Sequence, residues 1–272
     1  MSGPSPGGDL ATAPVSLRHN KDFQLLWSGQ AVSVLGSQIS KIAYPLLVLA
    51  MTGSPAKAGI AGFAAMLGYL LLPLPAGALA DQLDRRAVMI SCDAVRLAAV
   101  GSLAVAGWTA HITYAQVLIA GFIEGCASVF FGLAQRAALP MIVHTSQRPA
   151  AVSQNEARNF GAQLAGPALG GSLFGLSPAA PFAADAVTYL ASLVTLPFIK
   201  TPMQERGPAA RRGVLTSLRE GLAWTWREPF LRYSAVFAGA VNVLLQVQTL
   251  GLIVLVRHDG AAPAETGVIV AC

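Results

Sequence analysis

Three ionisable side chains interrupt long apolar stretches of the chain, and the chemistry they could carry is proton movement. They are Lys41, Glu124 and Asp185. Glu124 follows Tyr114, where its apolar stretch begins, by ten residues, which is about 15 Å along a helix and near the centre of a bilayer. Because an unpaired charge in the hydrocarbon is costly, such residues usually serve ion or proton pathways. We therefore expect Glu124 to carry a proton.

Two structural alternatives stay open for these side chains. Lys41 could form an ion pair with Glu124 or Asp185, or a charge could reach the membrane interface along its own side chain. Asp93 and Arg96 stand three positions apart on one helix face, and this spacing predicts a local ion pair. The residues of the candidate proton and substrate cavity are Gln38, Lys41, Tyr44, Glu124, Gln163 and Asp185.

The apolar stretches predict an all-α, polytopic membrane protein. Of the 272 residues, 54% are hydrophobic and 11% are charged, whereas a soluble domain carries about 25% charged residues. A helix of about 20 apolar residues crosses the hydrocarbon core. Seven segments meet this requirement, and an eighth begins near Thr266. The seven are 23–51, 56–80, 87–108, 114–143, 151–176, 179–199 and 230–256.

The basic residues predict the orientation and the domains. Fourteen of the 18 Lys and Arg residues fall on the set of connections that begins with the N-terminal tail, and two on the opposite set, which places the N-terminus in the cytoplasm. An amphipathic helix on the membrane surface, or else a solvated linker, is expected around Leu218 and Trp226. The predicted parts are a flexible cytoplasmic tail (1–20), a six-helix bundle (21–200), a cytoplasmic linker (201–229), and a seventh helix with part of an eighth (230–272).

A charged loop between the second and third segments carries the first motif. Gly77, Asp81, Arg85 and Arg86, with Leu79 and Ala80 between them, resemble the G-x-L-A-D-R-x-G-R-R loop of major facilitator superfamily transporters. The resemblance implies a gate in which Asp81 pairs with an arginine, and Arg136 is the candidate partner. The alternative is a basic loop with incidental acids.

Two positions of this loop depart from the family pattern. Gln82 replaces a usual basic residue, and Asp84 replaces a usual glycine.

The fifth segment carries a second motif, which resembles the G-P-x-x-G-G core of antiporters and exporters in the same superfamily. Its residues are Gly166, Pro167, Gly170 and Gly171, while Ala162 stands where the longer pattern has a glycine. The resemblance favours export over import. The alternative is ordinary close packing of helices through small residues.

Further patterns resemble the branch that contains enterobactin exporters and macrolide efflux proteins. They are the stretch 218–232, the turn 52–55 and the pair Asp93 and Arg96. The R-x-x-Q-G pattern of many drug exporters is absent, because Gly121 and Glu124 occupy its arginine and glutamine positions. This departure could move the protonatable role to Glu124.

The resemblance implies a secondary active transporter in the cytoplasmic membrane, which exports a lipophilic drug, siderophore or secondary metabolite in exchange for protons. The alternative is a truncated, non-transporting membrane protein or a remnant of such an exporter, because the chain ends inside the eighth segment. We expect protons and membrane lipids as partners. We expect no nucleic acid, cofactor, metal or enzymatic activity, since the His and Cys residues do not cluster and no nucleophile stands with a base.

Overall fold

Helices account for all the regular structure in the described part of the computed structural model, which comprises residues 16–73, 76, 83–203, 226–258, 262, 265, 266 and 269. The all-α prediction is therefore confirmed for these residues. The long helices are α1 (Lys21–Thr52), α2 (Pro55–Leu71), α4 (Arg85–Trp108), α5 (Tyr114–Ile142), α6 (Arg148–Leu176), α7 (Ala180–Thr195) and α9 (Pro229–His258). Short 3-10 turns span Thr145–Gln147 and Leu196–Phe198.

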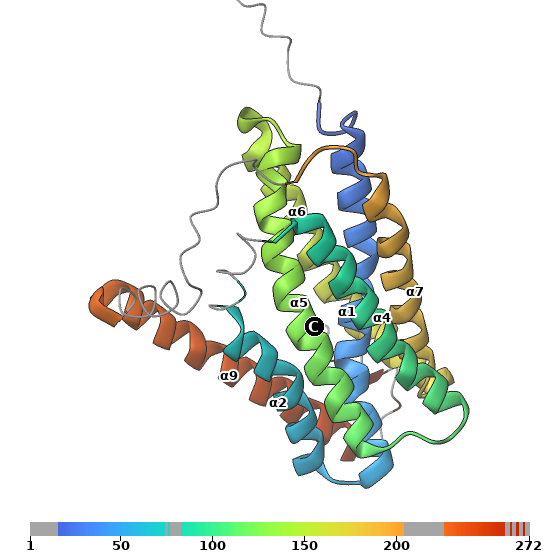
Figure 1. Cartoon of the computed structure of the whole chain (residues 1–272). Helices are drawn as coiled ribbons and strands as arrows, with labels where there is room; N and C mark the ends of the chain where they lie inside the picture. The colour runs from blue at the N-terminus through green and yellow to red at the C-terminus, as the bar shows by residue number, and fades with distance from the viewer. Residues whose placement is uncertain are drawn as a thin grey trace, which may run out of the picture.

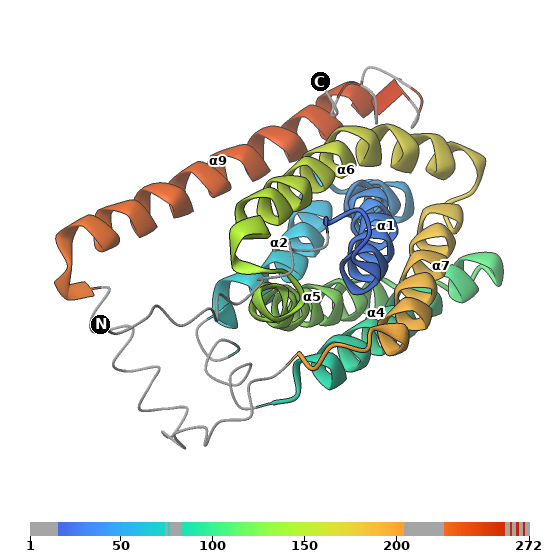
Figure 2. The same cartoon turned by 90° about the horizontal axis from the view of Figure 1, so that it is seen from above.

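Helix α1 occupies the centre of the bundle (Figure 2). It packs against α2, α5, α6 and α7, while α4 packs against α5 and α7. Helix α9 lies along the outside (Figure 1), and its Ile253 is buried in the same apolar core as residues 42–48, in the C-terminal third of α1. Side chains of α1 are thus the ones that can contact most other helices.

Side-chain caps fix where the helices begin. Asn20, Ser54, Asp84 and Thr113 each accept a hydrogen bond from a backbone N–H in the first turn of α1, α2, α4 and α5, respectively. Such caps satisfy donors that a helix start leaves free. Asp84, the departure from the loop pattern, thereby has a local structural role.

The turn predicted between the first two segments is confirmed. Helix α1 ends at Thr52, and Gly53 adopts a φ of 63°, a left-handed conformation that favours glycine. Pro55 then opens α2, at the position where its missing N–H costs nothing.

Five described helices are long and apolar enough to cross a membrane: α1, α4, α5, α7 together with the 3-10 turn that follows it, and α9. This supports a polytopic membrane protein. Helix α2 is apolar but has 17 residues, and α6 has 29 residues without belonging to the five. The six-helix bundle and the domain boundaries therefore stay predictions. The linker helix and most of the eighth segment lie outside the described residues.

Candidate functional site

Glu124 lies inside the bundle, where two tyrosine hydroxyls hold its carboxyl group. Its side chain projects from α5 and is 8% exposed. Tyr44 of α1 donates a hydrogen bond of 2.7 Å to Oε2, and Tyr189 of α7 donates one of 2.9 Å to Oε1. Both carboxyl oxygens therefore have neutral partners, from two different helices.

Next to this site, the predicted local pair of Asp93 and Arg96 is confirmed. The Arg96 guanidinium binds Asp93 Oδ1 in α4, and both side chains are buried. Ser192 of α7 donates to Asp93 Oδ2 at 2.6 Å, and Gln30 of α1 donates to Ser192 at 3.0 Å. The Arg96 guanidinium also lies 4.8 Å from the ring centroid of Tyr189. Tyr189 thus touches both the ion pair and Glu124.

Asp185 is fully buried on α7, one turn before Tyr189. Its Oδ1 accepts a hydrogen bond of 3.2 Å from Thr188. Its Oδ2 has no hydrogen bond of normal geometry, and neither has the neighbouring hydroxyl of Ser40 on α1. The structure therefore brings Asp185 to the same interior as Glu124, and no ion pair is formed by Asp185 in the described part of the chain, where Arg96 is paired with Asp93.

The remaining predicted cavity residues lie nearer the surface of the described bundle, and their place in a cavity stays a prediction. Lys41 and Gln163 are exposed, and Gln38 is half-buried where α1 meets α6. No ion pair joins Lys41 to Glu124 or Asp185 in the described structure. Lys41 directly follows the buried Ser40, so one step of about 100° around the helix turns it outward. The rotation of α1 about its axis, and hence the outward direction of Lys41, could not be predicted from the sequence.

The glycine motif of α6 lies against α1. A side chain at Gly166 would collide with Gln38, and a Cβ at Gly170 would lie 2.6 Å from the carbonyl oxygen of Ile39. Gly171 is buried, and Pro167 is half-buried. The close packing that the motif predicts is therefore observed, whereas the direction of transport is a separate question.

The charged loop can be followed only at its end, because Gly77 and Asp81 lie outside the described residues. Arg85 donates to the carbonyl oxygens of Ala137 at 2.8 Å and Met203 at 3.0 Å. Arg136 is exposed and stands directly before Ala137. The end of this loop therefore lies beside the Arg136 region of α5, while its proposed pairing with Asp81 stays a prediction.

A second set of contacts holds the chain after α7. Arg86 donates to the carbonyl oxygen of Thr201 at 3.1 Å. Asp22 of α1 accepts from the backbone N–H groups of Lys200 at 3.3 Å and Thr201 at 2.8 Å, and from the Thr201 hydroxyl. We refer to Asp22, Arg85 and Arg86 with residues 200–203 as the 200–203 clamp.

Sequence reasoning missed Tyr189, Ser192 and Asp22. Tyr189 follows Asp185 by four positions and Ser192 follows by seven, a spacing that keeps all three on one face of a helix. That periodicity was the available signal for the two α7 residues. Asp22, three residues before Leu25 at the start of an apolar helix, carried no comparable signal.

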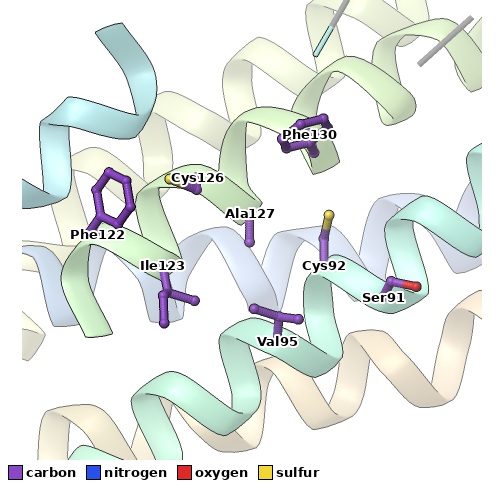
Figure 3. Close-up of a pocket in the computed structure, with 8 residues that line it drawn as sticks. All are labelled: Ser91, Cys92, Val95, Phe122, Ile123, Cys126, Ala127 and Phe130. Carbon is purple, nitrogen blue, oxygen red and sulfur yellow. The ribbon is translucent and has the colours of Figure 1, made fainter. Parts of the chain in front are cut away.

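The face between α4 and α5 is apolar, unlike the surroundings of Glu124 in the bundle interior. An open apolar groove of about 280 Å³ lies there, and Cys92, Cys126 and Phe122 are among its lining residues (Figure 3). Both thiols are free. No group of three or more His, Cys, Asp or Glu residues that could hold a metal ion occurs among the described residues. The ionisable groups lie in the bundle interior instead.

The helices and their buried polar site define a class, that of multi-pass α-helical membrane proteins. The chain belongs to the transmembrane secretion effector family of major facilitator transporters, whose family model matches residues 11–271.

Three relatives show where this chain stands in that family. It is 26% identical over 253 residues to the MFS-type transporter YfiS of Bacillus subtilis, itself uncharacterized, covering 91% of this chain and 60% of the relative. It is 24% identical over 239 residues to macrolide efflux protein A of Streptococcus pyogenes, covering 87% and 59%. It is 32% identical over 99 residues to the multidrug efflux pump Tap of Mycobacterium tuberculosis, covering 36% and 24%. The chain thus spans about 60% of the length of the first two relatives.

Proposed function

We propose that this chain acts in a secondary active exporter, which moves a lipophilic small molecule out of the cell in exchange for protons. The family to which the chain belongs supports transport over catalysis. Two of the relatives are named for macrolide or multidrug efflux, and this favours export. We place the protein in the cytoplasmic membrane with its N-terminus inside, on the distribution of basic residues.

The proposal of proton coupling rests on the surroundings of Glu124. A carboxyl held by a cation would have to break an ion pair before it could take up a proton. Glu124 is held instead by the hydroxyls of Tyr44 and Tyr189. A tyrosine hydroxyl can donate to a carboxylate and accept from a carboxylic acid, so both states of Glu124 keep a hydrogen-bond partner. The same site can therefore load and release a proton with little rearrangement.

The test measures ethidium and erythromycin accumulation in a drug-sensitive bacterial host. Cells with the chain should accumulate less of at least one probe than cells with an empty vector, and collapse of the proton gradient should abolish the difference. Glu124→Gln keeps the size of the side chain but cannot ionise, and it should raise accumulation to the empty-vector level. Glu156→Gln, which neutralises an exposed carboxyl of α6, is the matched control and should behave like the unmodified chain.

Two results would count against the proposal in different ways. If cells with the Glu124→Gln variant accumulate as little probe as cells with the unmodified chain, Glu124 has no part in coupling. If cells with the unmodified chain accumulate as much of both probes as cells with the empty vector, the alternative of a non-transporting membrane protein is favoured instead.

A further inference from the structure

The buried charges of the bundle do not balance. Three carboxyl groups are buried among the described residues, those of Asp93, Glu124 and Asp185, and Arg96 is the one buried cation in that part of the chain. Arg96 is engaged by Asp93. Two carboxyls therefore have no cation of their own. In a membrane interior, each must hold a proton for at least part of the time, because an uncompensated buried carboxylate is costly.

These two carboxyls lie close enough to influence each other. Tyr189, one turn after Asp185 on α7, donates a hydrogen bond of 2.9 Å to Glu124, so both carboxyls lie beside the same tyrosine and act on each other electrostatically. Two negative charges repel strongly at low dielectric. Simultaneous ionisation of both groups is thus unfavourable, and a proton that leaves one carboxyl stabilises the proton on the other. Such a pair titrates as a unit rather than as two independent acids.

Asp185 also has a neighbouring hydroxyl, that of Ser40, which is free to hydrogen-bond to a protonated or an ionised carboxyl. Its Oδ2 and the Ser40 hydroxyl are both fully buried, are neighbours, and make no hydrogen bond of normal geometry. A hydroxyl can accept from a protonated Oδ2 and can donate to an ionised one. Thr188 serves the other oxygen, Oδ1. The site can therefore accommodate both protonation states of Asp185 after a small rotation of one hydroxyl group.

The groups that face Asp185 come from all its neighbours. Helix α1 brings Ser40 and Tyr44, α4 brings the Asp93–Arg96 pair, and α5 brings Glu124. The charged residues of α6 lie in its first three turns, far along the helix from the glycines that meet α1 at this level: Arg148, Glu156 and Arg158. Among these neighbours, Glu124 is the group without an ion-pair partner that can gain and lose a proton.

We propose that Asp185 is a second proton-binding site, coupled to Glu124, so that the bundle exchanges two protons in each transport cycle. This rests on the proposed function. A proton from water binds Asp185 Oδ2 while the site is open to one side of the membrane. It returns to water when the site is open to the other side, and no other bond is formed or broken. A monovalent organic cation exported against two protons moves one net charge inward, whereas against one proton it moves none.

The first experiment does not need transport. Infrared difference spectra of the purified chain in lipid, recorded across a pH step, report the carbonyl stretch of buried carboxylic acids. The unmodified chain should show two such bands, Asp185→Asn and Glu124→Gln should each lose one, and Glu156→Gln should lose neither. Ser40→Ala should shift the Asp185 band without removing it. An unchanged spectrum for Asp185→Asn would overturn the proposal.

The second experiment measures ethidium efflux from proteoliposomes under an imposed pH gradient, with or without an imposed membrane potential. The potential should accelerate efflux by the unmodified chain. Asp185→Asn should keep the efflux driven by the pH gradient and lose the response to the potential. If this variant still responds to the potential, the two-proton exchange is refuted although the exporter stands. If the unmodified chain moves no ethidium, the proposed function fails on that probe, and the infrared bands alone decide whether Asp185 binds a proton.

Discussion

At the scale of single residues, the Arg96–Asp93 pair offers the sharpest test of stability. Arg96→Met removes the one cation that compensates Asp93 and leaves a buried carboxylate without its partner. Breaking a buried pair in this way costs about 3–5 kcal/mol, so the midpoint of thermal unfolding in detergent should fall substantially. The double variant Asp93→Leu with Arg96→Met removes both charges and should recover much of the loss. Equal loss in both variants would show that side-chain packing, not charge, governs this site.

The spacing of residues within one helix was predictable, and contacts between helices were not. Asp93 and Arg96 pair because a three-residue step keeps them on one face of α4, which the sequence contains. Tyr189 reaches Glu124 because α5 and α7 have particular rotations about their axes, which the sequence does not contain. Whether Lys41 pairs with the carboxyls depended on the same rotations, and its helix turns it outward, so that no such pair is present in the described structure.

At the scale of elements, the contact between α1 and α6 depends on the absence of a side chain at Gly170. A Cβ there would lie 2.6 Å from the carbonyl oxygen of Ile39 and equally close to Ile42, and neither a backbone carbonyl nor a packed side chain can give way cheaply. Gly170→Ala should therefore destabilise the bundle by about 1–3 kcal/mol. The matched control is Gly161→Ala, because a Cβ at Gly161 meets nothing within 4 Å. This control should be neutral or stabilising, by about 0.5–1 kcal/mol. Thermal unfolding of both variants measures the difference, and equal effects would contradict the close contact.

The start of α4 gives a second test at this scale. Asp84 Oδ1 accepts a hydrogen bond of 2.8 Å from the backbone N–H of Ala87. Asp84→Ala should cost about 0.5–2 kcal/mol, whereas Asp84→Gly, which restores the usual residue of the loop pattern, should cost only a few tenths. Unfolding midpoints in the order unmodified, glycine, alanine would support the cap. An alanine variant at least as stable as the glycine variant would contradict it.

At the scale of the whole molecule, the hydrophobic segments were predictable and their arrangement was not. Each of α1, α4, α5 and α9 begins and ends within a few residues of its predicted segment. Helix α6 is less apolar because its first half carries polar residues such as Asn155 and Arg158, so hydropathy alone did not reveal its place beside α1. The 200–203 clamp joins α1, α4, α5 and the end of α7. Only the folded chain brings these four together.

Orientation across the membrane is the last prediction, and α5 allows it to be tested with a single helix. Helix α5 has 29 residues, enough to cross a bilayer, and exposed side chains flank it at His111 and Ser146. If α5 crosses the membrane, these two positions lie on opposite faces. The distribution of basic residues predicts that His111 faces outward and Ser146 faces the cytoplasm.

Cysteine labelling distinguishes the two faces in a chain whose Cys272 is replaced by serine. A membrane-impermeant maleimide should label His111→Cys on intact cells, and it should label Ser146→Cys only after permeabilisation. The parent without either substitution should stay unlabelled, because Cys92 is buried and Cys126 lines an apolar groove, and aqueous reagents attack the exposed thiolate. The reverse pattern would invert the topology, and with it the side from which Glu124 and Asp185 are proposed to take up protons. Labelling of both positions on intact cells would show that α5 does not cross.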